Sequence, residues 1–191
     1  MGRSVSDQPQ YRVAMCRMTL ARVRALPQAD DILARIDPNA LAQIDDGGRL
    51  SWVPTQAFDQ VTDAMFEVLG TEPFREFFAA QANGWSDSKL FGPLMEAARR
   101  IFGSNPAGHL KWIGRAWELT TRNMGSATAT ETASGVRVTY EDLPPSSRVE
   151  RMVHSTYGSL YGIVASRGGT PDITIDDSKL AKGTLAFDVR W

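Results

Sequence analysis

Residues 136–141 of the chain read Val-Arg-Val-Thr-Tyr-Glu, so that apolar and polar side chains alternate. A period of two residues is typical of a β-strand that buries one of its faces. Ser134-Gly135 lies just before this stretch and favours a tight turn. Residues 126–132, on the other side of that turn, alternate small and polar side chains. The two stretches together predict an antiparallel hairpin.

The sequence after the hairpin predicts a helix and then two more strands. Pro144-Pro145 ends the hairpin, and an apolar stripe at helical spacing then continues to about Ala165. Gly168-Gly169 ends that helix, and residues 173–175 and 185–191 alternate again. The order β-β-α-β-β is typical of a four-stranded antiparallel sheet with one helix packed on it.

The first half of the chain predicts helices, because its apolar residues recur at steps of three and four. The predicted helices cover residues 17–26, 29–36, 54–69, 73–78, 88–102 and 106–122. We therefore expect an α+β fold in which N-terminal helices precede the β-β-α-β-β sheet. The last part alone, about 65 residues, would be only marginally stable. We expect one α+β ligand-binding-like domain at residues 11–191, after a disordered tail at residues 1–10.

The composition excludes several classes of function. The chain has 191 residues, with 21 Lys and Arg against 22 Asp and Glu, so it carries no excess of positive charge for nucleic acid. One cysteine excludes an intrachain disulfide and a metal site of several cysteines, and two histidines argue against a site of several histidines, so we expect no metal. No apolar run approaches the roughly 18 residues that span a bilayer, and the N-terminus is polar. We expect a cytoplasmic protein without a membrane span.

Five short motifs carry a resemblance to known proteins. They are Trp52-Val53-Pro54, Leu90-Phe91-Gly92-Pro93-Leu94, Tyr140-Glu141-Asp142-Leu143-Pro144, Gly158-Ser159-Leu160-Tyr161-Gly162 and Phe187-Asp188-Val189-Arg190-Trp191. With the predicted order of elements, they make the chain similar to the superfamily of haem-NO-binding and 4-vinyl-reductase-like domains. That superfamily includes small subunits of vesicle-tethering transport-particle complexes. Within it, the chain resembles the bacterial DUF2378 family over nearly its full length.

The resemblance implies a bacterial regulatory or sensory domain rather than an enzyme. We expect such a domain to recognise a small apolar ligand or a protein partner, commonly as a dimer, and to have no catalytic residue and no cofactor. Two alternatives stay open. One is a haem-based gas sensor ligated by His109, and the other is a dimerising structural adaptor that binds no small molecule.

The haem alternative depends on His109 and Tyr140. The resemblance implies an axial histidine on the helix before the sheet and a Tyr-x-Ser-x-Arg motif that holds the haem propionates. His109 lies on the predicted helix 106–122, and Tyr140 lies on the following hairpin. The motif then departs from the pattern, because Asp142 stands in place of the serine and Pro144 in place of the arginine. A carboxylate there would repel propionates, and the arginine fork that would pair with them is missing.

Aromatic side chains mark a candidate ligand pocket between the helices and the sheet. The candidates combine apolar bodies with a few polar tips, which suits a small apolar ligand: Phe91, Trp112, Trp117, Tyr140, Tyr157 and Tyr161. The same side chains would equally fill an ordinary core. Gly158 and Gly162, four residues apart on the last predicted helix, allow close approach to a sheet or to another helix. We expect packing on the protein's own sheet, with an interface to a second copy as the alternative.

Overall fold

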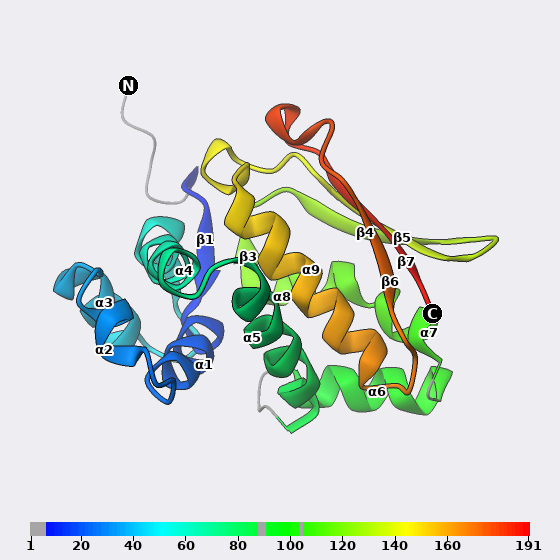
Figure 1. The fold of residues 1–191 in the computed structure, drawn as a ribbon, viewed down its shortest axis with the longest axis horizontal. Coiled ribbons are helices and arrows are strands. Elements are labelled where there is room, and N and C mark those ends of the chain that lie inside the picture. Colours follow the sequence, from blue (N-terminus) through cyan, green and yellow to red (C-terminus); the bar gives the residue numbers. More distant parts are fainter. Residues whose placement is uncertain (1–6, 88–90, 104) are drawn as a thin grey trace.

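The computed structural model describes residues 7–87, 91–103 and 105–191 (Figure 1). Its helices are α1 (Val13–Val23), α2 (Ala29–Leu33), α3 (Pro38–Asp46), α4 (Thr55–Leu69), α5 (Thr71–Asn83), α6 (Gly92–Phe102), α7 (Pro106–Leu110), α8 (Ile113–Thr120) and α9 (Glu150–Ala165). Its strands are β1 (Gln10–Arg12), β2 (Trp52–Pro54), β3 (Thr121–Arg122), β4 (Ser126–Thr132), β5 (Gly135–Glu141), β6 (Asp172–Asp176) and β7 (Leu185–Arg190).

The C-terminal half contains the predicted four-stranded sheet. Its strands lie in the order β4-β5-β7-β6, and each neighbouring pair is antiparallel. In the centre, Val138 pairs with Ala129 of β4 and with Phe187 of β7. The alternating apolar residues of β5 and β7 are buried: Val136, Val138, Tyr140, Leu185, Phe187 and Val189. The predicted α+β fold, with its β-β-α-β-β order, is confirmed.

Helix α9 lies between the buried face of this sheet and helix α5. Its apolar residues belong to the same hydrophobic cluster as the inward residues of β5 and β7. On its other side, a Cβ atom at Gly158 would overlap the carbonyl oxygen of Arg75, and one at Gly162 would overlap that of Ala79. The two glycines therefore bring α9 close to α5. Close approach to another helix was one of the possibilities that the sequence left open, whereas the favoured packing on the sheet is wrong because α5 covers that face of α9.

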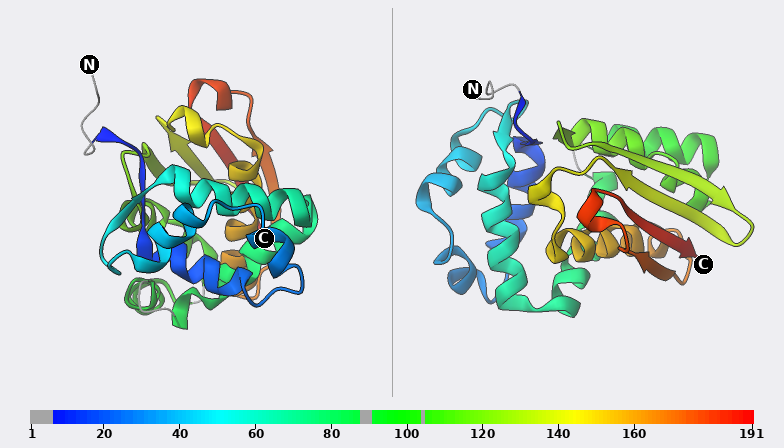
Figure 2. Two further views of the ribbon diagram at one scale, coloured as in Figure 1. Left: turned by 90° about the vertical axis from the view of Figure 1, so that its left-hand side faces the viewer. Right: turned by 90° about the horizontal axis from the view of Figure 1, so that it is seen from above.

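The N-terminal half forms a second hydrophobic cluster around helices α1 to α5. A short three-stranded sheet in the order β2-β1-β3 joins it to the rest of the chain. Tyr11 of β1 pairs with Val53 on one side and with Thr121 on the other. Figure 2 shows the N-terminal helices at one end of the molecule and the larger sheet at the opposite end. This small sheet was not predicted, because strands of two or three residues show no alternation.

Several predicted boundaries differ from those in the structure. Gln10, the last residue of the predicted tail, is buried in β1, whereas residues 1–6 lie outside the described residues. The helix predicted at 106–122 is divided, because the chain turns at Lys111-Trp112 between α7 and α8. Residues 88–90, at the start of another predicted helix, also lie outside the described residues.

Within residues 7–87, 91–103 and 105–191, each helix is too short or too polar to cross a membrane.

Candidate functional site

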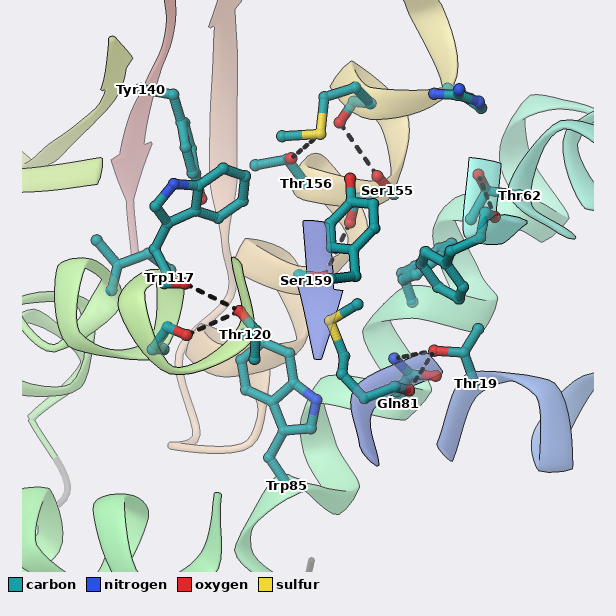
Figure 3. Close-up of a pocket in the computed structure, with 18 of the residues that line it drawn as sticks. Thr19, Thr62, Gln81, Trp85, Trp117, Thr120, Tyr140, Ser155, Thr156 and Ser159 are labelled. Atoms are coloured by element: carbon teal, nitrogen blue, oxygen red, sulfur yellow. Dashed lines mark hydrogen bonds between the residues drawn. The ribbon is translucent and has the colours of Figure 1, made fainter. Parts of the chain in front are cut away.

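A cavity of about 130 Å³ lies where the two halves of the molecule meet. Helices α1, α4 and α5 line it from the N-terminal cluster, and helices α8 and α9 and strand β5 line it from the C-terminal cluster. Figure 3 shows Trp117, Thr120 and Tyr140 on one side and Thr19, Thr62 and Gln81 on the other. The cavity therefore contacts both hydrophobic clusters.

Aromatic rings form much of the cavity wall: Tyr11, Phe58, Phe78, Trp85, Phe91, Trp117 and Tyr140. The rings of Trp117 and Tyr140 meet edge to face, with centroids 5.1 Å apart and an angle of 70° between planes. The indole nitrogen of Trp117 is buried and has no hydrogen-bond acceptor in the described part of the chain. Tyr11 meets Phe58 in the same edge-to-face way at 5.2 Å. These contacts hold the wall in place from both halves of the chain.

The serine and threonine hydroxyl groups of the wall donate their protons to acceptors on their own helices. Thr120 donates to the carbonyl of Ala116 at 2.8 Å, and Ser159 donates to that of Ser155 at 2.9 Å. Thr19, Thr62, Ser155 and Thr156 make equivalent bonds, to Met15, Asp59 and the oxygen and sulfur of Met152. Since a hydroxyl has one proton and two lone pairs, these side chains offer mainly acceptors to the cavity.

Gln81 is the most deeply buried amide of the wall, at 5% exposure. Its Nε2 donates to Oγ1 of Thr19 at 3.1 Å, while Thr19 uses its own proton on the carbonyl of Met15. The Oε1 atom of Gln81 has no hydrogen-bond donor in the described part of the chain. An unsatisfied buried acceptor costs about 1–3 kcal/mol.

An ion cluster with a buried pair, Asp59 and Arg151, borders the same cavity. The Arg151 guanidinium on α9 contacts two carboxylates of α4, that of Asp59 at 3.1 Å and that of Asp63. Asp59 and Arg151 both line the cavity, and their side chains are 11% and 10% exposed. Burial raises the pKa of Asp59 to about 6, because the nearby Arg151 opposes this effect only in part and Asp63 adds to it. Arg151 thus ties the last helix to the N-terminal half at the edge of the cavity.

Only three of the six predicted pocket aromatics line the cavity: Phe91, Trp117 and Tyr140. Trp112 instead packs in a small separate cluster around Phe91 and Met95. Tyr157 and Tyr161 stack on each other at 6.5 Å on the far side of α9, where Arg75 lies 4.2 Å from the ring of Tyr157. Their helix turns them away from the cavity, so this part of the predicted pocket is wrong.

His109 lies outside the cavity, on the short helix α7. It is only 2% exposed, and its Nε2 lies 3.1 Å from the carbonyl oxygen of Gly103. Burial lowers the pKa of His109, so that the neutral ring is favoured. His109 is therefore a buried neutral ring held against the Gly103 carbonyl, and it does not line the cavity.

Sequence reasoning missed Gln81, Thr19, Asp59 and Arg151 as parts of the site. Asp59 stands directly beside Phe58 on an apolar helix face, and Arg151 directly precedes Met152. A charged residue at the edge of an apolar stripe was the available signal in both cases. Nothing in the sequence indicates that α4 and α9 bring these two charges together.

The structure is an α+β fold with a cavity between its two halves. No protein-family model matches the chain, and no curated protein matches its sequence. Solved structures of H-NOX proteins share its fold. A variant H-NOX protein from K. algicida has 13% identity and a TM-score of 0.63, over 94% of this chain and 95% of that one. An oxygen-binding H-NOX domain related to soluble guanylate cyclases, in its oxygen complex, has 12% identity and a TM-score of 0.58, over 94% and 93%.

A further neighbour corrects one sequence-based expectation. This solved structure belongs to a study of haem redox potential and porphyrin distortion. It has 11% sequence identity and a TM-score of 0.60, over 94% of this chain and 99% of that one. At these identities the likeness establishes the fold, which is the one expected from the haem-NO-binding superfamily. The expectation of no cofactor is contradicted, because solved proteins with this fold include haem proteins.

Proposed function

We propose that this protein is a sensory domain of the H-NOX fold that binds a small, mainly apolar molecule in the cavity between its two halves. It acts by binding rather than by catalysis. The observation that carries the proposal is the cavity itself, with aromatic walls and a few polar groups directed from both halves of the chain. Such a combination is typical of small-molecule sites.

The position of the cavity supports a sensory role. A ligand there contacts α1, α4 and α5 on one side and α8, α9 and β5 on the other. A ligand shifts a conformational equilibrium only if it binds the two states differently. Contacts to both halves make its affinity depend on how the halves are packed, which is the property a sensor requires.

A small aromatic probe tests the proposal. Toluene or phenol should raise the melting temperature of the wild-type protein, because a ligand that binds only the folded state stabilises it by mass action. Ala116→Phe should remove the response, since Ala116 lines the cavity and is 8% exposed. Ala25→Phe, at an exposed position, is the matched control and should respond as the wild type does. If neither probe stabilises the wild type, or if Ala116→Phe responds equally, the proposal fails.

A haem-based gas sensor is the second candidate, favoured by the haem proteins among the structural neighbours. The residues present do not fit haem on His109, because His109 lies outside the cavity and its Nε2 already faces the Gly103 carbonyl. The cavity also holds about 130 Å³, near the size of an engineered site of about 150 Å³ that binds benzene. No histidine lines it within the described ranges.

An absorption spectrum of the protein mixed with haem decides this second candidate. Because His109 lies outside the cavity, we predict that any Soret band formed by the wild type also forms, unchanged, in His109→Ala. A band that forms in the wild type and disappears in His109→Ala would establish haem ligation by His109 and overturn the first proposal.

Three more specific predictions from the sequence, on family, location and partner, remain part of this proposal. They are membership of the bacterial DUF2378 family, a cytoplasmic location, and a protein partner or dimer that receives the signal. Light scattering with and without phenol tests the last of these, and a monomer in both conditions would count against self-association.

A further inference from the structure

We infer that the ligand of the cavity is a small neutral ring compound that carries a hydrogen-bond donor, as a phenol does, and that Gln81 Oε1 accepts its proton. This inference rests on the proposed function and narrows it to a chemical class. It depends on three properties of the cavity, namely its size, the direction of its hydrogen bonds and its charge.

The size and the walls favour a single ring. A volume of about 130 Å³ is close to that of an engineered cavity of about 150 Å³ that binds benzene. Trp117 and Tyr140 stand on one side, and Tyr11 and Phe58 reach the cavity from β1 and α4. Aromatic rings pair in offset-stacked or edge-to-face arrangements, each worth about 0.5–1.5 kcal/mol beyond burial, and this wall offers several faces and edges.

Among the described residues, the unpaired acceptor of Gln81 favours a donor on the ligand, and the unpaired indole N–H of Trp117 offers a donor to a ligand oxygen. The hydroxyls of Thr19, Thr120 and Ser159 donate to helix carbonyls, so that only their free lone pairs are left, and these can only accept a hydrogen bond. Gln81 Oε1 is an acceptor without a donor in the described part of the chain. A ligand O–H or N–H satisfies this group, whereas a ligand that offers only acceptors leaves it unpaired.

The charges at the cavity edge favour a neutral ligand. Arg151 is already in contact with the carboxylates of Asp59 and Asp63, so neither Arg151 nor Asp59 lacks an ionic partner. A carboxylate ligand would meet Asp59, and an ammonium ligand would meet Arg151. Removing either charged ligand from water costs free energy, and no unpaired charge of the described residues at the cavity edge would offset that cost.

Isothermal titration of the full chain with matched ring compounds tests the inference. Phenol should bind at least about tenfold more tightly than anisole, which has the same ring and oxygen but no proton to donate. Benzoate and benzylamine, the anionic and cationic ring compounds, should bind more weakly than phenol. Gln81→Leu should reduce the preference for phenol over anisole to about one, and Gln56→Leu, at an exposed position of α4, should retain it.

The outcomes separate this inference from the proposed function. If anisole binds as tightly as phenol to the wild type, or if a charged compound binds more tightly, the inference is overturned while cavity binding stands. If none of the four compounds binds, the proposed function fails as well. The wild-type comparison of phenol with anisole needs no variant, so it decides the matter even if Gln81→Leu does not fold.

Discussion

Asp59 is a buried carboxyl group whose protonation couples the site to pH. Its pKa is about 6 in the folded protein, against an ordinary value of 3.8, mainly because burial disfavours the charged form. The folded state therefore binds a proton between about pH 4 and 6 that the unfolded state has released. It follows that the contribution of Asp59 to stability is lost as the pH rises through this window.

Asp59→Asn should remove this dependence. The stability of the variant relative to the wild type should increase as the pH is raised from about 4 to 7, by at most about 3 kcal/mol. Urea denaturation at a series of pH values measures the difference. A difference that stays constant, or that falls as the pH rises, would show that Asp59 does not carry the raised pKa.

His109 has a structural role in this account. His109→Leu removes its bond to the Gly103 carbonyl and should lower the free energy of unfolding by about 1–3 kcal/mol. Since His109 does not line the cavity, the Kd of phenol for the folded variant should stay within about twofold of the wild-type value. Denaturation and titration of the same variant measure the two quantities. A large loss of ligand affinity with unchanged stability would place His109 in the site instead.

Individual site residues were only partly predictable from the sequence. Phe91, Trp117 and Tyr140 were found because large aromatic side chains are rare and commonly line pockets. Tyr157 and Tyr161 were included wrongly, since spacing along α9 does not show which face meets which neighbour. The role of Gln81 depends on a hydrogen bond to Thr19, which is 62 residues away in the sequence.

At the scale of elements, α9 and α5 approach closely because Gly158 and Gly162 lack side chains. Gly158→Ala should destabilise the protein by about 1–3 kcal/mol, because its Cβ overlaps the backbone of Arg75 and a carbonyl in a helix cannot yield. Gly84→Ala is the matched control, since the added Cβ meets only a side-chain nitrogen at 3.8 Å. It should be neutral or stabilising within about 1 kcal/mol. Equal effects of the two changes in chemical denaturation would contradict the close packing.

Elements with a long, regular pattern were the predictable ones. Strand β5 and strand β7 each alternate over six or seven residues, and α9 has an apolar stripe over its whole length. Strands β1, β2 and β3 are too short for a pattern and form through pairing between distant segments. The turn between α7 and α8 interrupts an apolar stripe that reads as continuous, and no glycine or proline marks it.

At the scale of the whole molecule, two hydrophobic clusters share one cavity. Trp117 packs against both of them, and Arg151 of α9 reaches Asp59 of α4 beside the cavity. A molecule bound there replaces empty space between the clusters with contacts to each. The central claim is therefore that a small ring compound occupies this cavity and no other place on the protein.

Amide chemical shifts during a phenol titration test that claim most directly. We predict saturable shifts that are largest around Gln81, Ala116, Thr120 and Ser159, on the three helices α5, α8 and α9 that line the cavity. Amides on the outer face of the sheet, such as that of Thr174, should remain unchanged. Shifts confined to the exposed apolar surface around Ile101 of α6, or shifts that do not saturate, would contradict the account.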